Sequence, residues 1–98
     1  MINLIENKFR ECKKEKRQAL LTYTVAGDNN KNSSLKILKS ISEYADIIEL
    51  GFPHNTPIAD GGQIQESSHR ALKAGIKIND VFKIAKKFKS YKKDHPLI

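Results

Sequence analysis

Apolar side chains return every three or four positions in several segments of the chain, which is the spacing of amphipathic helices. The first segment covers residues 2–16, and its apolar stripe consists of Ile2, Ile5, Phe9 and Cys12. Cys12 is therefore expected to be a small buried hydrophobic side chain. Three further helices are predicted: one that begins near Ser33 or Ser34, either of which can cap it, one over residues 63–73, and one that begins at Asn79.

Two short segments have the composition of β-strands instead. Residues 19–25 read ALLTYTV, which is rich in residues that favour strands, and residues 46–51 read DIIELG, a nearly unbroken apolar run. Residues 26–30 have turn chemistry, and residues 52–61 are predicted to form a loop because they hold two prolines and end in glycine. The last residues, Pro96-Leu97-Ile98, look like the first step of another strand.

This order of elements predicts an α/β fold. Strands that alternate with helices pair in parallel through right-handed crossovers. Two strands and the start of a third do not bury both faces of a parallel sheet. We therefore expect residues 1–98 to form a single partial domain, the opening portion of a longer α/β structure, with exposed strand edges and an uncovered apolar face.

Composition narrows the class of protein further. The chain has 98 residues, of which 39% are hydrophobic and 30% charged, and no apolar stretch is long enough to span a membrane. Its amino-terminal segment lacks the apolar core of a secretory signal, and the single cysteine allows no internal disulfide. These features predict a cytoplasmic location and no membrane association.

The net charge of +7 raises the alternative of a small basic nucleic-acid-binding protein. Arginine is scarce, however, and no aromatic residues interleave with the basic ones as they do in nucleic-acid-binding motifs. The lysines of the last predicted helix mostly avoid its apolar stripe, which indicates a solvated outer face. We therefore expect no nucleic-acid partner. That alternative predicts association with DNA or RNA that weakens steeply as salt rises.

The strongest candidate for chemistry is Glu49. Because side chains alternate across a strand, Glu49 shares a face with Ile47 and Gly51 and lies near the carboxyl end of the second strand. In parallel α/β structures that end faces the active site. A carboxylate that loses hydration there should have a raised pKa, which suits proton transfer. The alternative is a strand-end glutamate that leans into water or caps a neighbouring helix.

Asp60 is a second candidate carboxylate. It follows the proline loop and precedes Gly61-Gly62, so the loop could return it over the strand end, where it could take a different role from Glu49. The alternative is that it caps the helix that follows. The three histidines, His54, His69 and His95, are scattered and have no partner at a metal-ligand spacing, so no metal site is expected.

The run from Ile47 to Gln65, IIELGFPHNTPIADGGQIQ, resembles the signature of the tryptophan synthase alpha subunit family, roughly E-L-G-x-P-F-S-D-P-x-A-D-G-P-x-I-Q. Residues 22–28, TYTVAGD, resemble the first strand and turn of that family. The resemblance covers essentially the whole chain and only about the first third of a family member. It implies a (β/α)8 TIM barrel, of which this chain would supply the amino-terminal helix, the first two βα units and the start of the third strand.

The resemblance also implies an activity. The family consists of lyases of tryptophan biosynthesis that cleave indole-3-glycerol phosphate into indole and glyceraldehyde 3-phosphate. The alpha subunit needs no cofactor, because the pyridoxal phosphate belongs to the beta subunit, its partner in a heterotetramer. The alternative is a non-catalytic truncated fragment that at most binds the beta subunit.

The resemblance also implies roles for individual residues, according to their positions in the signature. The resemblance implies that Glu49 is the acid–base residue, that Asp60 pairs with the indole N–H, and that Tyr23 lines the indole pocket. A phenylalanine is common at that last position, so the tyrosine hydroxyl needs a partner. The loop that contacts the beta subunit corresponds to Pro53, Thr56 and Pro57, and Thr56 replaces the usual aspartate of the family.

Overall fold

The computed structural model describes residues 3–54 and 61–98. Its elements in chain order are α1 (Leu4–Lys14), β1 (Leu21–Val25), α2 (Lys31–Ile41), β2 (Ile47–Gly51), α3 (Gly62–Lys73) and α4 (Ile78–Tyr91). This order matches the predicted alternation of helices and strands. Within the described residues, no helix is both long and apolar enough to cross a membrane.

The two strands lie side by side in parallel, with Leu21 opposite Ile47 and Val25 opposite Gly51. These two strands form a two-stranded sheet, and the end of the chain pairs with the free side of β2 as the start of a third strand. Ile48 and Leu97 form a parallel bridge, and the Ile98 backbone N–H donates to the Ile48 carbonyl over 2.9 Å. The predicted start of a third strand is therefore confirmed.

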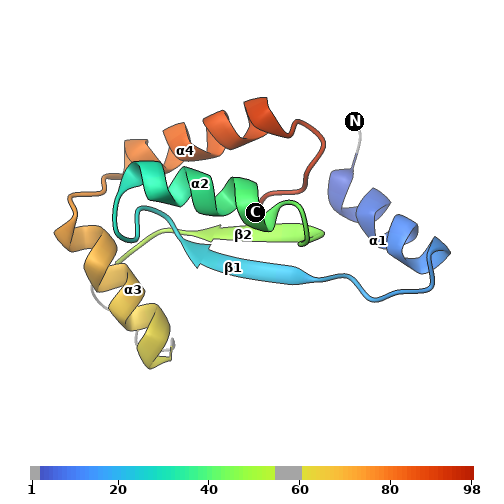
Figure 1. Ribbon diagram of the computed structural model, residues 1–98, viewed down its shortest axis with the longest axis horizontal. Coiled ribbons are helices and arrows are strands. Elements are labelled where there is room, and N and C mark those ends of the chain that lie inside the picture. Colours follow the sequence, from blue (N-terminus) through green and yellow to red (C-terminus); the bar gives the residue numbers. More distant parts are fainter. Residues whose placement is uncertain (1–2, 55–60) are drawn as a thin grey trace.

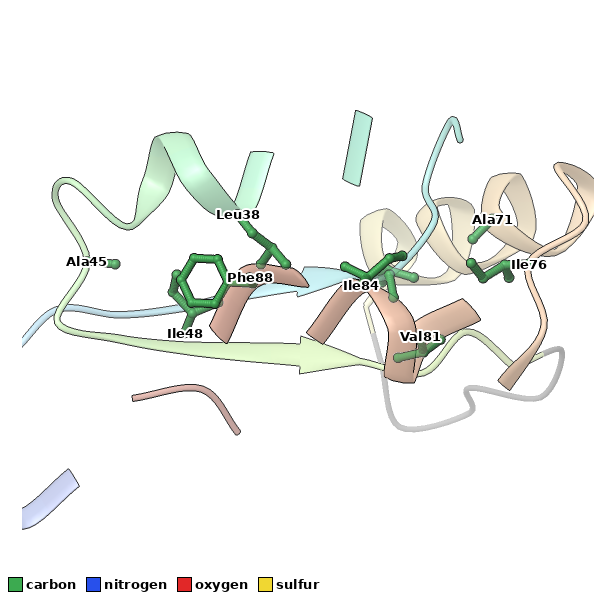
Figure 2. Close-up of a cluster of buried hydrophobic side chains, with 10 residues drawn as sticks. Leu38, Ala45, Ile48, Ala71, Ile76, Val81, Ile84 and Phe88 are labelled. Carbon is green, nitrogen blue, oxygen red and sulfur yellow. The ribbon is translucent and has the colours of Figure 1, made fainter. Parts of the chain in front are cut away.

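The helices α2 and α4 pack against each other and cover one face of this sheet, while α1 lies beyond the amino ends of the strands and α3 beyond their carboxyl ends (Figure 1). The core forms between this helical layer and β2 (Figure 2). Leu38 of α2, Ile48 of β2 and Phe88 of α4 are all completely buried. These side chains exclude water from the interface, which is the main contribution that holds the helices on the sheet.

The opposite face of the sheet is only partly covered in the described residues, although Ile47 of β2 is buried. Leu21 and Tyr23 of β1 point to this face and are 46% and 45% exposed. Because a parallel sheet is normally covered on both sides, an open face with these apolar groups is incomplete. This agrees with the predicted uncovered face.

The helix starts at Gly62 and Ile78 lie within one residue of the prediction, and the start of α2 differs more. The helix expected to begin near Ser33 or Ser34 begins at Lys31, and its N-cap is Asn30, whose side chain accepts a hydrogen bond from the Ser33 backbone N–H over 2.8 Å. Asparagine is as good a cap as serine, and the sequence pattern favoured a turn at Asn30. Ser34 is instead buried inside the helix, where its hydroxyl accepts from the Gly27 N–H.

The prediction for the first helix is confirmed at Cys12, which is 2% exposed. Burial, together with the nearby Asp46 carboxylate, raises the pKa of the Cys12 thiol, so it stays protonated and unreactive at neutral pH. The stripe is only partly covered, because Ile5 and Phe9 are 37% and 46% exposed. Ile2 lies outside the described residues.

A polar cluster around Asp46 ties the end of α1 to the start of both strands. The Arg17 guanidinium donates to both Asp46 carboxylate oxygens over 2.9 and 3.0 Å, and the Leu20 backbone N–H donates to the same carboxylate over 2.8 Å. Asp46 is buried, and the hydrogen bonds from Arg17 are the largest of several influences that lower its pKa to about 2. A bidentate pair of this kind is among the stronger polar contacts in proteins.

We expect Asp46→Asn to destabilise the chain by about 1–3 kcal/mol at neutral pH, because it leaves Arg17 and the Leu20 N–H with a weaker acceptor. The lowered pKa of Asp46 also makes the free energy of unfolding depend on pH. The contribution of Asp46 is complete above the ordinary aspartate pKa of about 4 and is lost as the pH falls through its folded value of about 2. Urea denaturation at a series of pH values measures both effects. A variant with unchanged stability, or with the same acid dependence as the parent, would contradict this.

Candidate active site at the carboxyl ends of the strands

Tyr23 and Glu49 are direct neighbours across the parallel sheet, since they are register partners on β1 and β2. Register partners in a sheet point to the same side, so both side chains lie on the open face that α2 and α4 do not cover. Glu49 is half-buried there, two residues before the end of β2. The predicted position of Glu49, near the carboxyl end of an apolar strand, is confirmed.

The Tyr23 ring lies against the backbone of Gly51, two residues after Glu49. A Cβ atom built on Gly51 would overlap the Tyr23 hydroxyl and the adjacent ring carbons. The Tyr23 side chain therefore occupies the space that a side chain at position 51 would need. The result is a surface on which one aromatic ring and one carboxylate lie next to each other, which can hold a planar apolar ligand beside a proton-transferring group.

Of the other predicted site residues, one lies within the described part of the chain and three lie outside it. Pro53 is half-buried and follows β2 by two residues. Between them, Phe52 stacks edge-on against Phe82 of α4, with ring centroids 5.7 Å apart. Thr56, Pro57 and Asp60 lie outside the described residues. Where the chain is described again, Gly61 rather than Asp60 occupies the N-cap position of α3.

Sequence reasoning missed a second polar cluster at this end of the sheet. The Arg70 side chain on α3 donates to both oxygens of Asp28, over 2.7 Å from Nε and 2.9 Å from Nη2. The Ser67 hydroxyl donates to the same carboxylate over 2.6 Å. We call these three residues the Asp28 clasp. The hydrogen bonds from Arg70 are the main reason that the pKa of Asp28 is lowered, so Asp28 is a carboxylate at neutral pH.

The turn that carries Asp28 is held from other sides as well. The Gly27 backbone N–H donates to the buried Ser34 hydroxyl over 3.1 Å, and Gly27 has a positive φ of 80° that favours glycine. The Ile76 side chain, from the connection between α3 and α4, packs against the Cα of Gly27 and occupies the space that a side chain would need. The turn after β1 therefore contacts α2, α3 and the connection between α3 and α4.

The histidines do not form a metal site in the part of the chain that the structure describes, where no group of three suitable ligands occurs. His95 is buried next to Phe88, and its Nε2 lies 2.8 Å from the Ala45 carbonyl oxygen. This contact ties the end of α4 to the start of β2, so His95 has a structural role in the fold.

Comparisons with known proteins agree with this geometry. The family model described as "Tryptophan synthase alpha chain" matches residues 9–98. The tryptophan synthase alpha chain of Pelagibacter ubique is 66% identical over 97 residues, which are 99% of this chain and 37% of that relative. The corresponding chain of Thermoanaerobacter pseudethanolicus is 46% identical over 98 residues, again 99% of this chain and 37% of the relative.

Solved structures give the same result. Tryptophan synthase subunit alpha from Legionella pneumophila superposes with a TM-score of 0.93 at 28% identity, over 99% of this chain and 37% of that one. The tryptophan synthase complex from Pyrococcus furiosus matches with a TM-score of 0.77 at 47% identity, over 81% of this chain and 32% of that one.

The parallel strands, the helices that cross between them and the site at their carboxyl ends define part of a (β/α)8 barrel, as predicted. The chain belongs to the tryptophan synthase alpha chain family. It spans about 37% of the length of the curated relatives that it matches.

Proposed function

We propose that this chain supplies the first part of the active site of a tryptophan synthase alpha chain, a lyase that cleaves indole-3-glycerol phosphate into indole and glyceraldehyde 3-phosphate. The observation that carries the proposal is the pairing of Tyr23 with Glu49 on one face, at the carboxyl ends of β1 and β2, in a member of this family. An aromatic surface suits the indole ring, and the adjacent carboxylate suits the proton transfers.

In this reaction Glu49 would act as both acid and base. Its carboxyl group donates a proton to indole C3, and the bond between C3 and the hydroxyl-bearing carbon of the side chain then breaks. The electron pair of that bond returns to the indole ring. The Glu49 carboxylate takes the hydroxyl proton as the aldehyde forms, so the proton that Glu49 gave to C3 is replaced by the one lost from oxygen. Asp60 would accept a hydrogen bond from the indole N–H and stabilise the positive charge that develops on the ring.

These steps would need no cofactor in the alpha chain, and they would need a phosphate anchor that we expect to lie outside residues 1–98. In (β/α)8 barrels the phosphate site is typically built from the loops after the seventh and eighth strands. Binding energy from the phosphate would orient the glycerol chain on Glu49. We therefore expect the 98-residue chain alone to release no indole.

The proposed function is tested in a longer chain that contains the rest of the barrel. A hybrid chain joins residues 1–98 to the part of the Pelagibacter ubique alpha chain that follows its matched segment, which is reasonable at 66% identity. We expect purified hybrid to release indole from indole-3-glycerol phosphate, with the whole P. ubique chain as the positive control. A hybrid that folds, by circular dichroism and gel filtration, but releases no indole would contradict the proposed function.

The hybrid also tests the aromatic surface. Gly51→Ala should push the Tyr23 ring off the end of β2. We expect a KM for indole-3-glycerol phosphate higher by about tenfold, because the indole ring loses part of its contact area, with little change in the thermal midpoint. Steady-state kinetics measures this. In a hybrid that also carries Tyr23→Leu, Gly51→Ala should change KM much less. If the two substitutions instead change KM independently of each other, the expected contact between the two residues is contradicted.

We propose the tryptophan synthase beta subunit as the partner, in a cytoplasmic complex. The relative from P. furiosus is described as part of a tryptophan synthase complex. In this chain Pro53, the described residue of the partner loop, follows the exposed Phe52, whose ring contacts the exposed Phe82. A pull-down with a beta subunit tests this, both for the 98-residue chain and for the hybrid. Binding without indole release by the hybrid would favour the non-catalytic alternative.

A further inference from the structure

The helical layer formed by α2 and α4 carries most of the positive charge of the chain. These two helices hold seven lysines and one acidic residue, Asp80, in a chain whose net charge is +7. No acidic residue lies in the first turn of α2, where negative charge would offset the positive end of the helix dipole. The layer is therefore an electropositive surface that attracts anions.

A small groove between the two helices gathers part of this charge. Lys31 of α2 and Lys83 and Lys87 of α4 line a cavity of about 120 Å³. Its floor is apolar, since Leu35 packs against the core and Ile84 is buried. The volume suits a ligand of a few heavy atoms, because a water molecule occupies about 30 Å³ in the liquid. We call this cavity the Lys31 groove.

Positive charge exceeds negative charge in the Lys31 groove. Asp80 is its one acidic lining residue, and the Asp80 carboxylate already accepts from the Lys77 backbone N–H over 2.8 Å and lies 3.1 Å from the Lys31 ammonium nitrogen. The hydrogen bond from Lys77, followed by the contact with Lys31, lowers the pKa of Asp80, so this group is a carboxylate at neutral pH. One negative charge therefore faces three ammonium groups.

Lys83 and Lys87 are the two groove lysines without an ion pair to any acidic side chain that the structure describes. They lie four positions apart on α4, and like charges at this spacing repel each other across one helical turn. An anion in the groove would reduce this repulsion. It would also meet Lys31 on the opposite wall, so both helices would contribute to its binding.

We propose that the Lys31 groove binds a phosphate dianion, either free phosphate or the phosphate group of a small monoester. Its two negative charges match the excess of three ammonium groups over one carboxylate. Its oxygen atoms point in several directions, so they can accept from lysines on both walls, whereas the two oxygens of a carboxylate lie in one plane. The site consists only of residues on α2 and α4, so the inference does not depend on the proposed function.

The first experiment titrates inorganic phosphate into isotope-labelled protein and follows the backbone amide signals by NMR. The pH is slightly alkaline, so that phosphate is mostly a dianion, and chloride keeps the ionic strength constant near its physiological value. We expect the signals of Lys31, Asn32 and residues 83–87 to shift and saturate with a Kd of about 1–10 mM, because exposed lysines bind weakly. No saturable shift at these positions up to about 50 mM phosphate would overturn the proposal.

The titration is carried out with the 98-residue chain and with the hybrid. Each amide signal reports on one position, so a phosphate site elsewhere in the hybrid does not interfere. The hybrid also keeps the test valid if the 98-residue chain does not fold by itself.

A pair of substitutions tests whether the groove itself binds the anion. Lys83→Gln together with Lys87→Gln should weaken phosphate binding by about tenfold. Lys36→Gln together with Lys86→Gln is the matched control, because these exposed lysines lie on the same two helices but outside the groove. The control should change Kd by less than about twofold, since more distant charges are screened at this ionic strength. Equal weakening by both pairs would show a response to overall charge only and would overturn the site.

Asp80→Asn should have the opposite effect. It removes the negative charge of the groove, while the asparagine oxygen can still accept from the Lys77 N–H, so phosphate should bind about threefold more tightly. Unchanged or weaker binding in this variant would contradict the proposed place of the anion.

Glycerol 3-phosphate in place of inorganic phosphate distinguishes the two sources of the same group. Tighter binding of the ester, with added shifts at Leu35 and Ile84 on the floor, assigns the groove to a phosphate monoester. Tighter binding of inorganic phosphate assigns it to free phosphate. Failure of both to shift the groove signals overturns the proposal and leaves the proposed function untouched.

Discussion

Glu49→Gln in the hybrid chain is expected to lower kcat by about 100- to 10,000-fold, the range that a positioned general acid–base group contributes. Glutamine has nearly the shape of glutamate, so packing at the half-buried end of β2 should be preserved. An amide cannot give a proton to indole C3 and take one from the glycerol hydroxyl. Indole release in steady state measures the effect, and KM should change much less than kcat because the aromatic surface is untouched.

Glu11→Gln is the matched control for this substitution. Glu11 is an exposed carboxylate on α1 that pairs with Lys8 over 3.3 Å, far along the chain from the proposed site. It should have the activity of the parent hybrid. A Glu49→Gln variant that is folded and retains more than about a tenth of the parent kcat would show that Glu49 is not the acid–base group.

Phe88→Ala is expected to cost about 3–5 kcal/mol of unfolding free energy, which is the largest stability effect that we predict for a single side chain. Phe88 is completely buried in the core that Figure 2 shows. Its ring meets that of His95 edge-on, with ring centroids 5.7 Å apart. Its removal would leave a cavity where α2, α4 and β2 meet. Because small domains are stable by only about 5–15 kcal/mol, this change could leave the 98-residue chain unfolded.

Urea denaturation followed by circular dichroism measures this loss, in the 98-residue chain and in the hybrid. Phe82→Ala provides the matched control, since Phe82 lies on the same helix but is 60% exposed and contacts Phe52. The control should cost no more than about 1.5 kcal/mol. Equal losses for the two phenylalanines would contradict the described packing of α4.

The sequence pattern was sufficient for the elements and for the position of Glu49. Helical spacing located the four helices, and the apolar run before Glu49 located the second strand. The start of α2, at Lys31 rather than Ser33 or Ser34, was misplaced because neighbouring asparagine and serine residues can all cap a helix. Strand alternation then placed Glu49 on one face, because its period of two leaves no other choice.

The Asp28 clasp could not be predicted in this way. Asp28 and Arg70 lie 42 positions apart, and each by itself is an ordinary turn residue or helix-surface residue. The same holds for Asp46 and Arg17, which are 29 positions apart. A long-range polar pair has no periodic signal in the sequence, because its partners meet only after the helices have packed on the sheet.

The amino-acid sequence by itself determined the alternation of helices and strands, the parallel sheet and the carboxylate at the end of its second strand. These features depend on local spacing, which a linear pattern records directly. The family resemblance of residues 47–65 also came from the sequence, and it was confirmed. Only the tertiary structure decided that Tyr23 lies beside Glu49 and over Gly51, and that Arg70 holds α3 to the turn after β1. The physical reason is that the register of the strands and the seating of the helices are set by packing between distant segments.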